Sequence, residues 1–274
     1  EEDSWSGRNI HFGVREHAMG GIVNGMALHG GIRPYSATFL VFADYMRPPL
    51  RLGAIMSLPV IYIFTHDSIA VGEDGPTHQP VEQLAALRAI PGLTVIRPAD
   101  GNETASAWAV ALEQSSPSVL ILTRQGLPQI TSPEVAKNGV SRGGYILSDS
   151  EKDTFDVILI ASGSEVSLVV AAGELLESKG VVSRIVSMPS WELFEEQSEA
   201  YRNQVLPPDF PAKLAVEAGI GQGWEKFIGG DGEMHVINNF GASAPGKVVM
   251  EKFGFTAEEV ASHAQRLIKK LRSR

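Results

Sequence analysis

The sequence predicts an α/β protein with two consecutive domains, each a mainly parallel sheet flanked by helices. Short apolar runs alternate with segments of helical periodicity along the whole chain, which favours this class. The run VIYIF at residues 60–64 is continuously apolar, as expected for a parallel strand that is covered on both faces. The 274 residues, 43% of them hydrophobic, are also sufficient for two domains with a core each.

We expect the first domain to span residues 1–128. Its expected strands and helices follow from the apolar runs and the helical periodicity between them. Pro48 and Pro49 fall inside one expected helix and should interrupt or bend it. The strands are expected at 10–12, 59–64, 94–96 and 118–122, and the helices at 16–28, 39–56, 80–89 and 103–114.

A linker is expected at residues 129–143, where prolines and glycines occur with little periodicity. The second domain should then span residues 144–274, with the same alternation of strands and helices. Gly163 and Ser164 open one of its helices; a capping serine in a packing domain is favoured there over an anion site. Its strands are expected at 156–161, 181–186, 213–216 and 234–237, and its helices at 164–178 and 256–270.

The composition excludes several classes of function. Without a cysteine, the chain has no disulfide, no thiolate metal site and no cysteine nucleophile. The net charge is −9 and the basic residues are scattered, so we expect no nucleic-acid partner. No apolar run approaches the ~20 residues that cross a bilayer, and no signal peptide is evident. We therefore expect a cytoplasmic protein with no membrane partner.

Glu16 lies in the segment GVREHAMG, which directly follows an expected strand and opens a helix. A carboxylate in the first turn of a helix is stabilised by the helix dipole and by unpaired backbone donors. If Glu16 is considered alone, a capping role is therefore favoured over a chemical role.

The segment THDSIAVGEDGPTHQP at residues 65–80 is the most polar part of the first half. It follows the buried strand at the carboxyl end, where open α/β sheets bind ligands, and long loops of this kind are usually functional. Its two histidines, His66 and His78, are twelve positions apart, which matches no common metal-binding spacing. Acid–base chemistry or substrate contact is favoured for them over a purely structural role, and no metal site is expected in this chain.

Phe39, Phe42 and Tyr45 are three positions apart, so a helix would place them along one face. Such an aromatic stripe usually belongs to the core. The alternative is a platform for a flat heteroaromatic ring.

The chain resembles the transketolase family over essentially its whole length. The matching segments keep their order and spacing, and a long match such as the histidine-containing segment is specific. They are HFGVREHAMGGIVNGMALHGG, PYSATFLVFADYMR, THDSIAVGEDGPTHQPVEQLAALR, LTRQGLP and FGASAPG. The resemblance implies a transferase of the pentose phosphate pathway, which moves a two-carbon ketol unit reversibly from a ketose phosphate to an aldose phosphate.

For the cofactor, the resemblance implies thiamine diphosphate. Glu16 is similar to the catalytic glutamate that bonds N1′ of the aminopyrimidine ring. Phe39, Phe42 and Tyr45 correspond to the aromatic pocket around that ring.

For the substrate, the resemblance implies four binding residues. His66 and His78 match histidines that line the substrate channel, with His78 handling protons. Asp74 is similar to the aspartate that recognises the hydroxyl next to the carbonyl. Arg124, in LTRQ, is similar to an arginine that clamps the sugar phosphate, since its planar donor pair suits that oxyanion.

The resemblance also has gaps. The family's N-terminal domain, which binds the diphosphate and Mg²⁺ or Ca²⁺, has no counterpart here, and the first strand and helix of the pyrimidine-binding domain are also expected to be missing. Because the family places its active site between two subunits of a homodimer, Glu16 should act in trans and the chain alone should be inactive.

Three alternatives remain open from the sequence. The chain could be the C-terminal subunit of a split transketolase. It could also be a non-catalytic interaction protein that has kept the fold. Dihydroxyacetone synthase is a relative that is harder to separate from transketolase than deoxyxylulose-phosphate synthase is.

Overall fold

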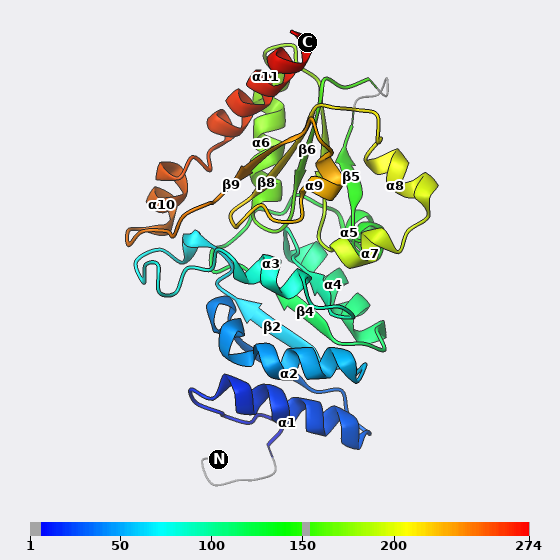
Figure 1. The fold of residues 1–274 in the computed structure, drawn as a ribbon, viewed down its shortest axis with the longest axis vertical. Helices are drawn as coiled ribbons and strands as arrows, with labels where there is room; N and C mark the ends of the chain where they lie inside the picture. Colours follow the sequence, from blue (N-terminus) through cyan, green and yellow to red (C-terminus); the bar gives the residue numbers. More distant parts are fainter. Residues whose placement is uncertain (1–6, 150–153, 274) are drawn as a thin grey trace.

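The computed structural model describes residues 7–149 and 154–273 and consists of two α/β units (Figure 1). The first unit is built on a four-stranded sheet with the order β1-β2-β4-β3, in which every pair is parallel. All residues of β3 and β4 are buried, because helices cover both faces. The strands are β1 Tyr35–Phe39, β2 Ile61–Thr65, β3 Thr94–Ile96 and β4 Ser118–Ile121.

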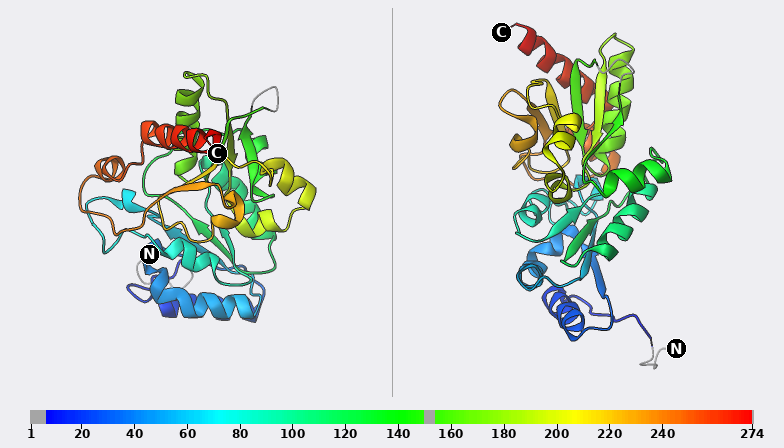
Figure 2. Two further views of the ribbon diagram at one scale, coloured as in Figure 1. Left: turned by 45° about the horizontal axis from the view of Figure 1, so that its top comes forward. Right: turned by 90° about the vertical axis from the view of Figure 1, so that its right-hand side faces the viewer.

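The helices of the first unit form successive layers on this sheet. α1 is the outermost layer and lies at the end of the molecule opposite α11 (Figure 2). The helices are α1 Glu16–His29, α2 Ala43–Ile55, α3 Gln83–Arg88, α4 Gly101–Glu113 and α5 Pro133–Val140, with short 3-10 turns η1 Leu40–Phe42 and η2 Ile69–Val71.

The second unit is a five-stranded sheet with the order β5-β7-β6-β8-β9, parallel except for β5, which runs antiparallel to β7. Its strands are β5 Tyr145–Ser148, β6 Val157–Ala161, β7 Ser183–Ser187, β8 Lys213–Glu217 and β9 Glu233–Val236. Its helices are α6 Glu165–Glu177, α7 Trp191–Glu195, α8 Glu199–Val205, α9 Glu225–Ile228, α10 Gly246–Lys252 and α11 Ala257–Arg272.

The predicted fold class is confirmed, and four details of the first domain need correction. No strand forms at residues 10–12, so Glu16 follows an irregular segment. The strand β1 was not predicted, and the helix expected from residue 39 begins at Ala43. That helix continues through Pro48 and Pro49 without interruption.

The expected linker at 129–143 includes the helix α5. Ser132 caps it by accepting a hydrogen bond from the Val135 amide at 3.2 Å, and Pro133 occupies its first turn. Gly139 lies against the Tyr145 ring, where a Cβ atom would come within 2.3 Å. The domain boundaries at 128 and 144 remain predictions.

The two units share a continuous core. Ile69, Val81 and Ala99 of the first unit belong to the cluster built around β6, β8, α6 and α11 of the second. Within residues 7–149 and 154–273, no helix has the length and apolarity to cross a membrane.

Candidate active site

Three neighbouring strands of the first sheet end at one edge, and each ends at or just before a candidate site residue. Phe39 is the last residue of β1, His66 directly follows β2, and Arg124 lies three residues beyond β4. Because β1, β2 and β4 are adjacent and parallel, their carboxyl ends converge. The topology therefore brings together residues that are up to 85 positions apart in the sequence.

The aromatic residues and both loop histidines form one chain of ring contacts. The rings of Phe39 and His66 stack with centroids 3.6 Å apart, and those of Phe39 and Phe42 are nearly parallel at 6.1 Å. Phe42 in turn contacts Tyr45 at 6.1 Å and the edge of His78 at 5.6 Å. Phe39 and Phe42 are half-buried and Tyr45 is 64% exposed, so the stripe is not part of the core.

His66 combines an unusual backbone with a perturbed side chain. Its φ of 63° lies in the left-handed region, which is uncommon for a residue other than glycine. Burial lowers the pKa of the His66 imidazole, and the Arg124 charge lowers it further, while Asp74 and Asp67 act in the opposite direction. His66, Asp74 and Arg124 thus share one electrostatic environment, in which neutral His66 is favoured.

His78 is half-buried and is oriented by its neighbour in the loop. Its Nδ1 atom is hydrogen-bonded to Thr77 Oγ1 at 2.9 Å, and its backbone amide donates to the Gly75 carbonyl at 3.0 Å. Gly75 has a φ of 74°, so this turn requires a residue without a side chain. The turn leaves Nε2 of His78 available for a proton or a substrate hydroxyl.

Glu16 lies in the first turn of α1 and is half-buried. The helices α1 and α2 pack side by side in the same direction: Gly20 is against Met46 and Pro49, and Asn24 donates to the Pro49 carbonyl at 2.7 Å. Glu16 lies one helical turn before Gly20, so the same register places it level with the beginning of α2, next to the aromatic stripe. The structure gives its carboxylate no hydrogen bond or ion pair to any other described residue.

The loop at residues 65–80, which we call the histidine loop, is also attached to the second unit. The Gln79 amide donates to the Ala242 carbonyl at 2.9 Å, and Ser243 Oγ donates to the Glu73 carbonyl. The sequence analysis assigned no role to these residues. The only signal was the segment FGASAPG at residues 240–246, which carries part of the resemblance but no obvious chemistry.

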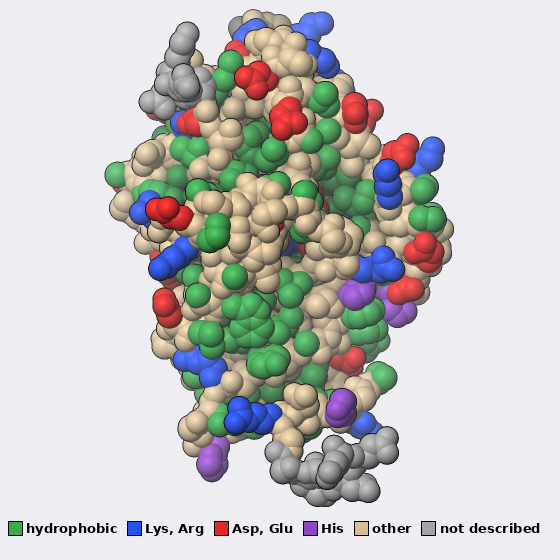
Figure 3. Space-filling model, turned by 180° about the vertical axis from the view of Figure 1, so that it is seen from behind, with side chains coloured by type: hydrophobic (Ala, Val, Ile, Leu, Met, Phe, Trp, Pro, Cys, Tyr) green, Lys and Arg blue, Asp and Glu red, His purple; other side chains and the backbone are tan. Residues whose placement is uncertain are grey.

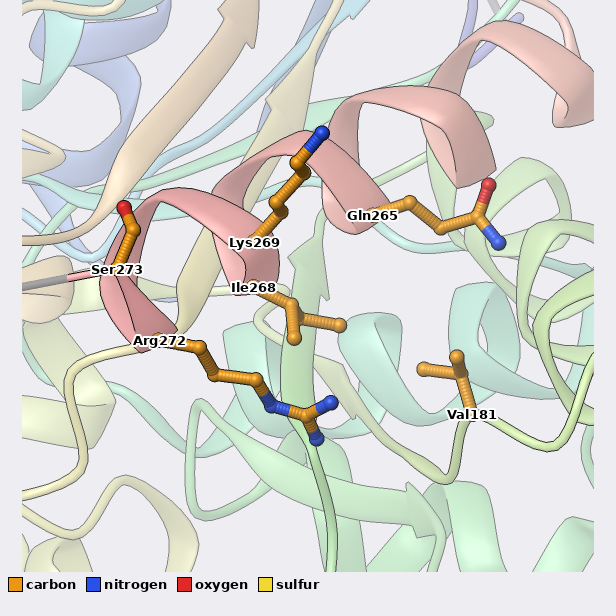
Figure 4. Close-up of a pocket in the computed structure, with 6 residues that line it drawn as sticks. All are labelled: Val181, Gln265, Ile268, Lys269, Arg272 and Ser273. Carbon is orange, nitrogen blue, oxygen red and sulfur yellow. The ribbon is translucent and has the colours of Figure 1, made fainter.

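One groove on the second unit lies far from these residues. It has a volume of about 440 Å³ and is formed by the last turns of α11 and the residue Val181 (Figure 4). Arg272 is paired with Asp156 at 2.7 Å, and Lys269 points away from Val181. Among the residues that the structure describes, no three histidine, aspartate or glutamate side chains come together as a metal site.

Comparisons with known proteins identify the family of both units. Residues 1–129 match the family model of the transketolase pyrimidine-binding domain, and residues 143–256 match that of the transketolase-like C-terminal domain. The chain is 57% identical over 268 residues to the transketolase of Halalkalibacterium halodurans and 53% identical to that of Bacillus subtilis, covering 97% of this chain in both cases. It spans about 40% of the length of these curated relatives.

Solved transketolase structures have the same fold as this chain. A transketolase from Pichia stipitis in complex with sedoheptulose-7-phosphate superimposes with a TM-score of 0.91 at 44% identity, over 98% of this chain and 39% of that one. A split-gene transketolase, described as an inactive β4 tetramer, shares the fold with a TM-score of 0.78 at 24% identity, over 93% of this chain and 82% of that one. The chain therefore belongs to the transketolase family and carries its pyrimidine-binding and C-terminal domains.

Proposed function

We propose that this chain supplies one half of the active site of a cytoplasmic transketolase. The reaction is the reversible transfer of a two-carbon ketol unit from a ketose phosphate to an aldose phosphate, a step of the pentose phosphate pathway. The observation that carries this proposal is the convergence of aromatic rings, two histidines, Asp74 and Arg124 at one edge of the first sheet.

The residues present fit the pyrimidine ring of thiamine diphosphate. Phe39 and Phe42 offer nearly parallel, half-buried faces, and aromatic surfaces of this kind bind flat rings. The open carboxyl of Glu16 lies level with them and would bond the pyrimidine nitrogen N1′. When bound, thiamine diphosphate supplies an electron sink for cleavage of the carbon–carbon bond. The diphosphate and its Mg²⁺ or Ca²⁺ would be held by the family's N-terminal domain.

Sugar phosphates fit the opposite side of the cluster. Arg124 is exposed and can donate two parallel hydrogen bonds to a phosphate, with neutral His66 beside it as a further partner. The exposed carboxylate of Asp74 can accept a hydrogen bond from the hydroxyl next to the carbonyl. His78, with its Nδ1 atom engaged by Thr77, is oriented to move a proton at Nε2.

Assembly into a homodimer would complete the site with the N-terminal domain of the second subunit. The outer layer formed by α1 and α2 exposes Ile22, Leu28, Leu52, Ile55 and Met56, each by between 46% and 62%. Several of these side chains line a groove of about 240 Å³ between the two helices. Exposed apolar patches of this kind mark protein interfaces, and further hydrophobic side chains are exposed on the rear of the same unit (Figure 3).

A second candidate keeps the chemistry but makes the chain a natural subunit of a split enzyme. The fold shared with the split-gene transketolase, of which this chain covers 82%, favours that arrangement. The reading frame upstream of Glu1 separates the two, because a separate gene for the diphosphate-binding domain is expected only for a split enzyme. A non-catalytic interaction protein is disfavoured, because the aromatic cluster and both histidines keep a ligand-accessible arrangement.

The proposal is tested in a chimaera in which this chain replaces the matching 268 residues of the Halalkalibacterium halodurans transketolase. We expect ketol transfer from sedoheptulose-7-phosphate to an aldose phosphate. Glu16→Gln should reduce kcat by at least about 100-fold, since it removes the carboxyl proton. The matched control is Glu113→Gln, an equal change at an exposed helix end, which should retain full activity. Equal activity of the two variants would refute the role of Glu16.

The isolated chain provides a complementary measurement. Because the diphosphate and metal would be held by another domain, we expect no tight binding of thiamine diphosphate and Mg²⁺ to the 274-residue chain. Calorimetric binding in the low micromolar range would contradict the view that this chain holds only half of the site.

A further inference from the structure

We propose that the second unit positions the histidine loop for sugar phosphates by holding it at its base near Asp67, in its middle at Ile69 and at its far end near Gln79. Gln79, Ser243 and Arg97 are then positioning residues of the active site. The effect on catalysis rests on the proposed function, whereas the attachment itself does not.

The far end of the loop is held by one buried amide. Gln79 is 2% exposed, and its Nε2 atom donates to two carbonyls, Gly72 within the loop at 2.8 Å and Ala242 of the second unit at 2.9 Å. The same donor therefore closes the loop on itself and joins it to the segment 240–246. Figure 1 shows this segment, in orange before α10, running beside the loop after β2.

The segment 240–246 is in direct contact with the loop along its length. A Cβ atom on Gly241 would come within 1.8 Å of Gln79 Oε1, and one on Gly246 within 2.4 Å of the Ala70 carbonyl. At Gly246 the two backbones approach too closely for a side chain, whereas at Gly241 a side chain would displace the Gln79 amide. Ser243 Oγ adds a hydrogen bond to the Glu73 carbonyl, next to Asp74.

The middle of the loop is buried in the core of the second unit. Ile69, in the turn η2, is fully buried and belongs to the same apolar cluster as Val249 of α10. Ser68 caps this turn by accepting a hydrogen bond from the Ala70 amide at 3.3 Å. Removing the second unit would therefore expose an apolar side chain of the loop.

The base of the loop is held by a buried ion network. Asp67, directly after His66, accepts a hydrogen bond from Arg97 Nε at 2.8 Å. Arg97 also donates from Nη1 to Glu165 and to the Ser162 carbonyl of the second unit. The strained backbone of His66 therefore lies beside an anchor that ends in the other domain.

Asp74 and His78 lie between the attachments at Asp67 and Gln79. A substrate-binding group that is held in place loses less freedom on binding, so anchoring of the loop should lower the KM for sugar phosphates. The segment FGASAPG thereby gains a function, although none of its residues needs to touch the substrate.

The attachment is tested by amide hydrogen exchange on the 274-residue chain. Gly241→Ala should drive a methyl group into Gln79 and increase the exchange rate of amides within residues 72–79 by at least about tenfold. The matched control is Gly230→Ala, where an added methyl group meets open space, and its exchange should be unchanged. Ser243→Ala, which creates no clash, should cause a smaller increase in the same amides. Unchanged exchange in a folded Gly241→Ala or Ser243→Ala chain would overturn the inference.

The catalytic consequence is measured in the chimaera. Ser243→Ala should raise the KM for an aldose phosphate by roughly fivefold with kcat nearly unchanged, because orientation of the loop and not the chemistry is affected. A loss of kcat with an unchanged KM would overturn the positioning role. An inactive chimaera would refute the proposed function, and the exchange measurement then still decides the inference.

Discussion

The two sheets have similar architectures but use their carboxyl edges in opposite ways. In the first sheet, the ends of β1, β2 and β4 carry Phe39, His66 and Arg124, which remain accessible. In the second sheet, the ends of β6 and β8 carry Ser162 and Glu217, which are fully buried. The edge of a parallel sheet is the usual place for a ligand, so the difference lies in what fills it.

The edge of the second sheet is filled by the first unit. Arg97 donates to the Ser162 carbonyl at 2.7 Å and to Glu165, while Arg88 makes a bidentate pair with Glu217 at 2.9 Å for both bonds. These side chains occupy the position that a ligand would take. A sheet edge thus becomes an active site or a domain interface according to the partner that covers it.

The first unit also packs against the helix start at Gly163 and Ser164. A Cβ atom on Gly163 would lie 2.7 Å from the Arg97 guanidinium carbon, and Ser164 Oγ donates to Glu165 at 2.6 Å. No space remains there for an anion. The packing role that the sequence favoured fits the structure, but the expected cap is wrong, because Ser164 makes no capping hydrogen bond.

The largest effect on stability is expected from Arg97→Met, which disrupts the interface at the carboxyl edge of the second sheet. The change leaves the buried carboxylates of Asp67 and Glu165 without their cation, and breaking a buried pair in this way costs about 3–5 kcal/mol in the free energy of unfolding. Urea denaturation followed by fluorescence measures this loss. Arg266→Met removes an exposed arginine and should change stability by less than about 0.5 kcal/mol. Similar results for the two variants would contradict the role of the network.

A smaller, pH-dependent effect is expected from Glu217→Gln. Burial alone would raise the pKa of the Glu217 carboxyl, but the charges of Arg88 and Arg97 outweigh it and lower the pKa below its usual range. A group of this kind contributes stability above its unfolded pKa of about 4.3, and the contribution is lost as the pH falls through the lower folded value. The variant should thus be less stable than the wild type by about 3 kcal/mol at pH 7, and this difference should shrink below about pH 4.

Denaturation curves of both proteins between pH 3 and pH 8 test this expectation, because titration of all other groups cancels in the difference. Glu174→Gln, an exposed change on α6, serves as the control and should give a small, constant difference. A stability difference for Glu217→Gln that grew as the pH fell would contradict a lowered pKa of Glu217 in the folded protein.

The local features of both edges could be predicted from the sequence, because they depend on neighbouring residues. The strand at residues 94–96 was predicted at its observed limits, since its apolar run is continuous. The triplet at residues 10–12 has apolar ends but lies on the surface, so no sheet pairs with it. The strand β1, YSATF, was missed because it has no continuous apolar run and its last residue, Phe39, also begins the aromatic stripe.

The contacts between the units could not be predicted in the same way. Gln79 and Ala242 are 163 positions apart, and Arg97 and Glu165 are 68 apart, so no local pattern joins them. The histidine loop itself was recognisable, because its polar residues lie within sixteen positions after a buried strand. The residues that we propose to face the ligand could thus be predicted from the sequence, whereas those that hold the loop could not.

The smallest effects on stability are expected at the carboxyl edge of the first sheet, which we call the open edge because its charges are exposed. Arg124→Gln and Asp74→Asn should each change the free energy of unfolding by less than about 0.5 kcal/mol. Their effect should appear in the titration of His66. Because the Arg124 charge disfavours the imidazolium form, Arg124→Gln should raise the pKa of His66, whereas Asp74→Asn removes a stabilising anion and should lower it further.

Histidine Cε1–H resonances followed by NMR from pH 4 to pH 9 measure these shifts, with His66→Asn identifying the signal. Arg266→Gln, far from the loop, is the matched control and should leave the His66 titration unchanged. Opposite shifts in the two variants would show that Arg124 and Asp74 act on one site although little folding energy depends on them. An unchanged His66 titration in both variants would mean that Arg124, Asp74 and His66 do not lie together at the edge of the first sheet. It would contradict our proposal that this edge is an active site.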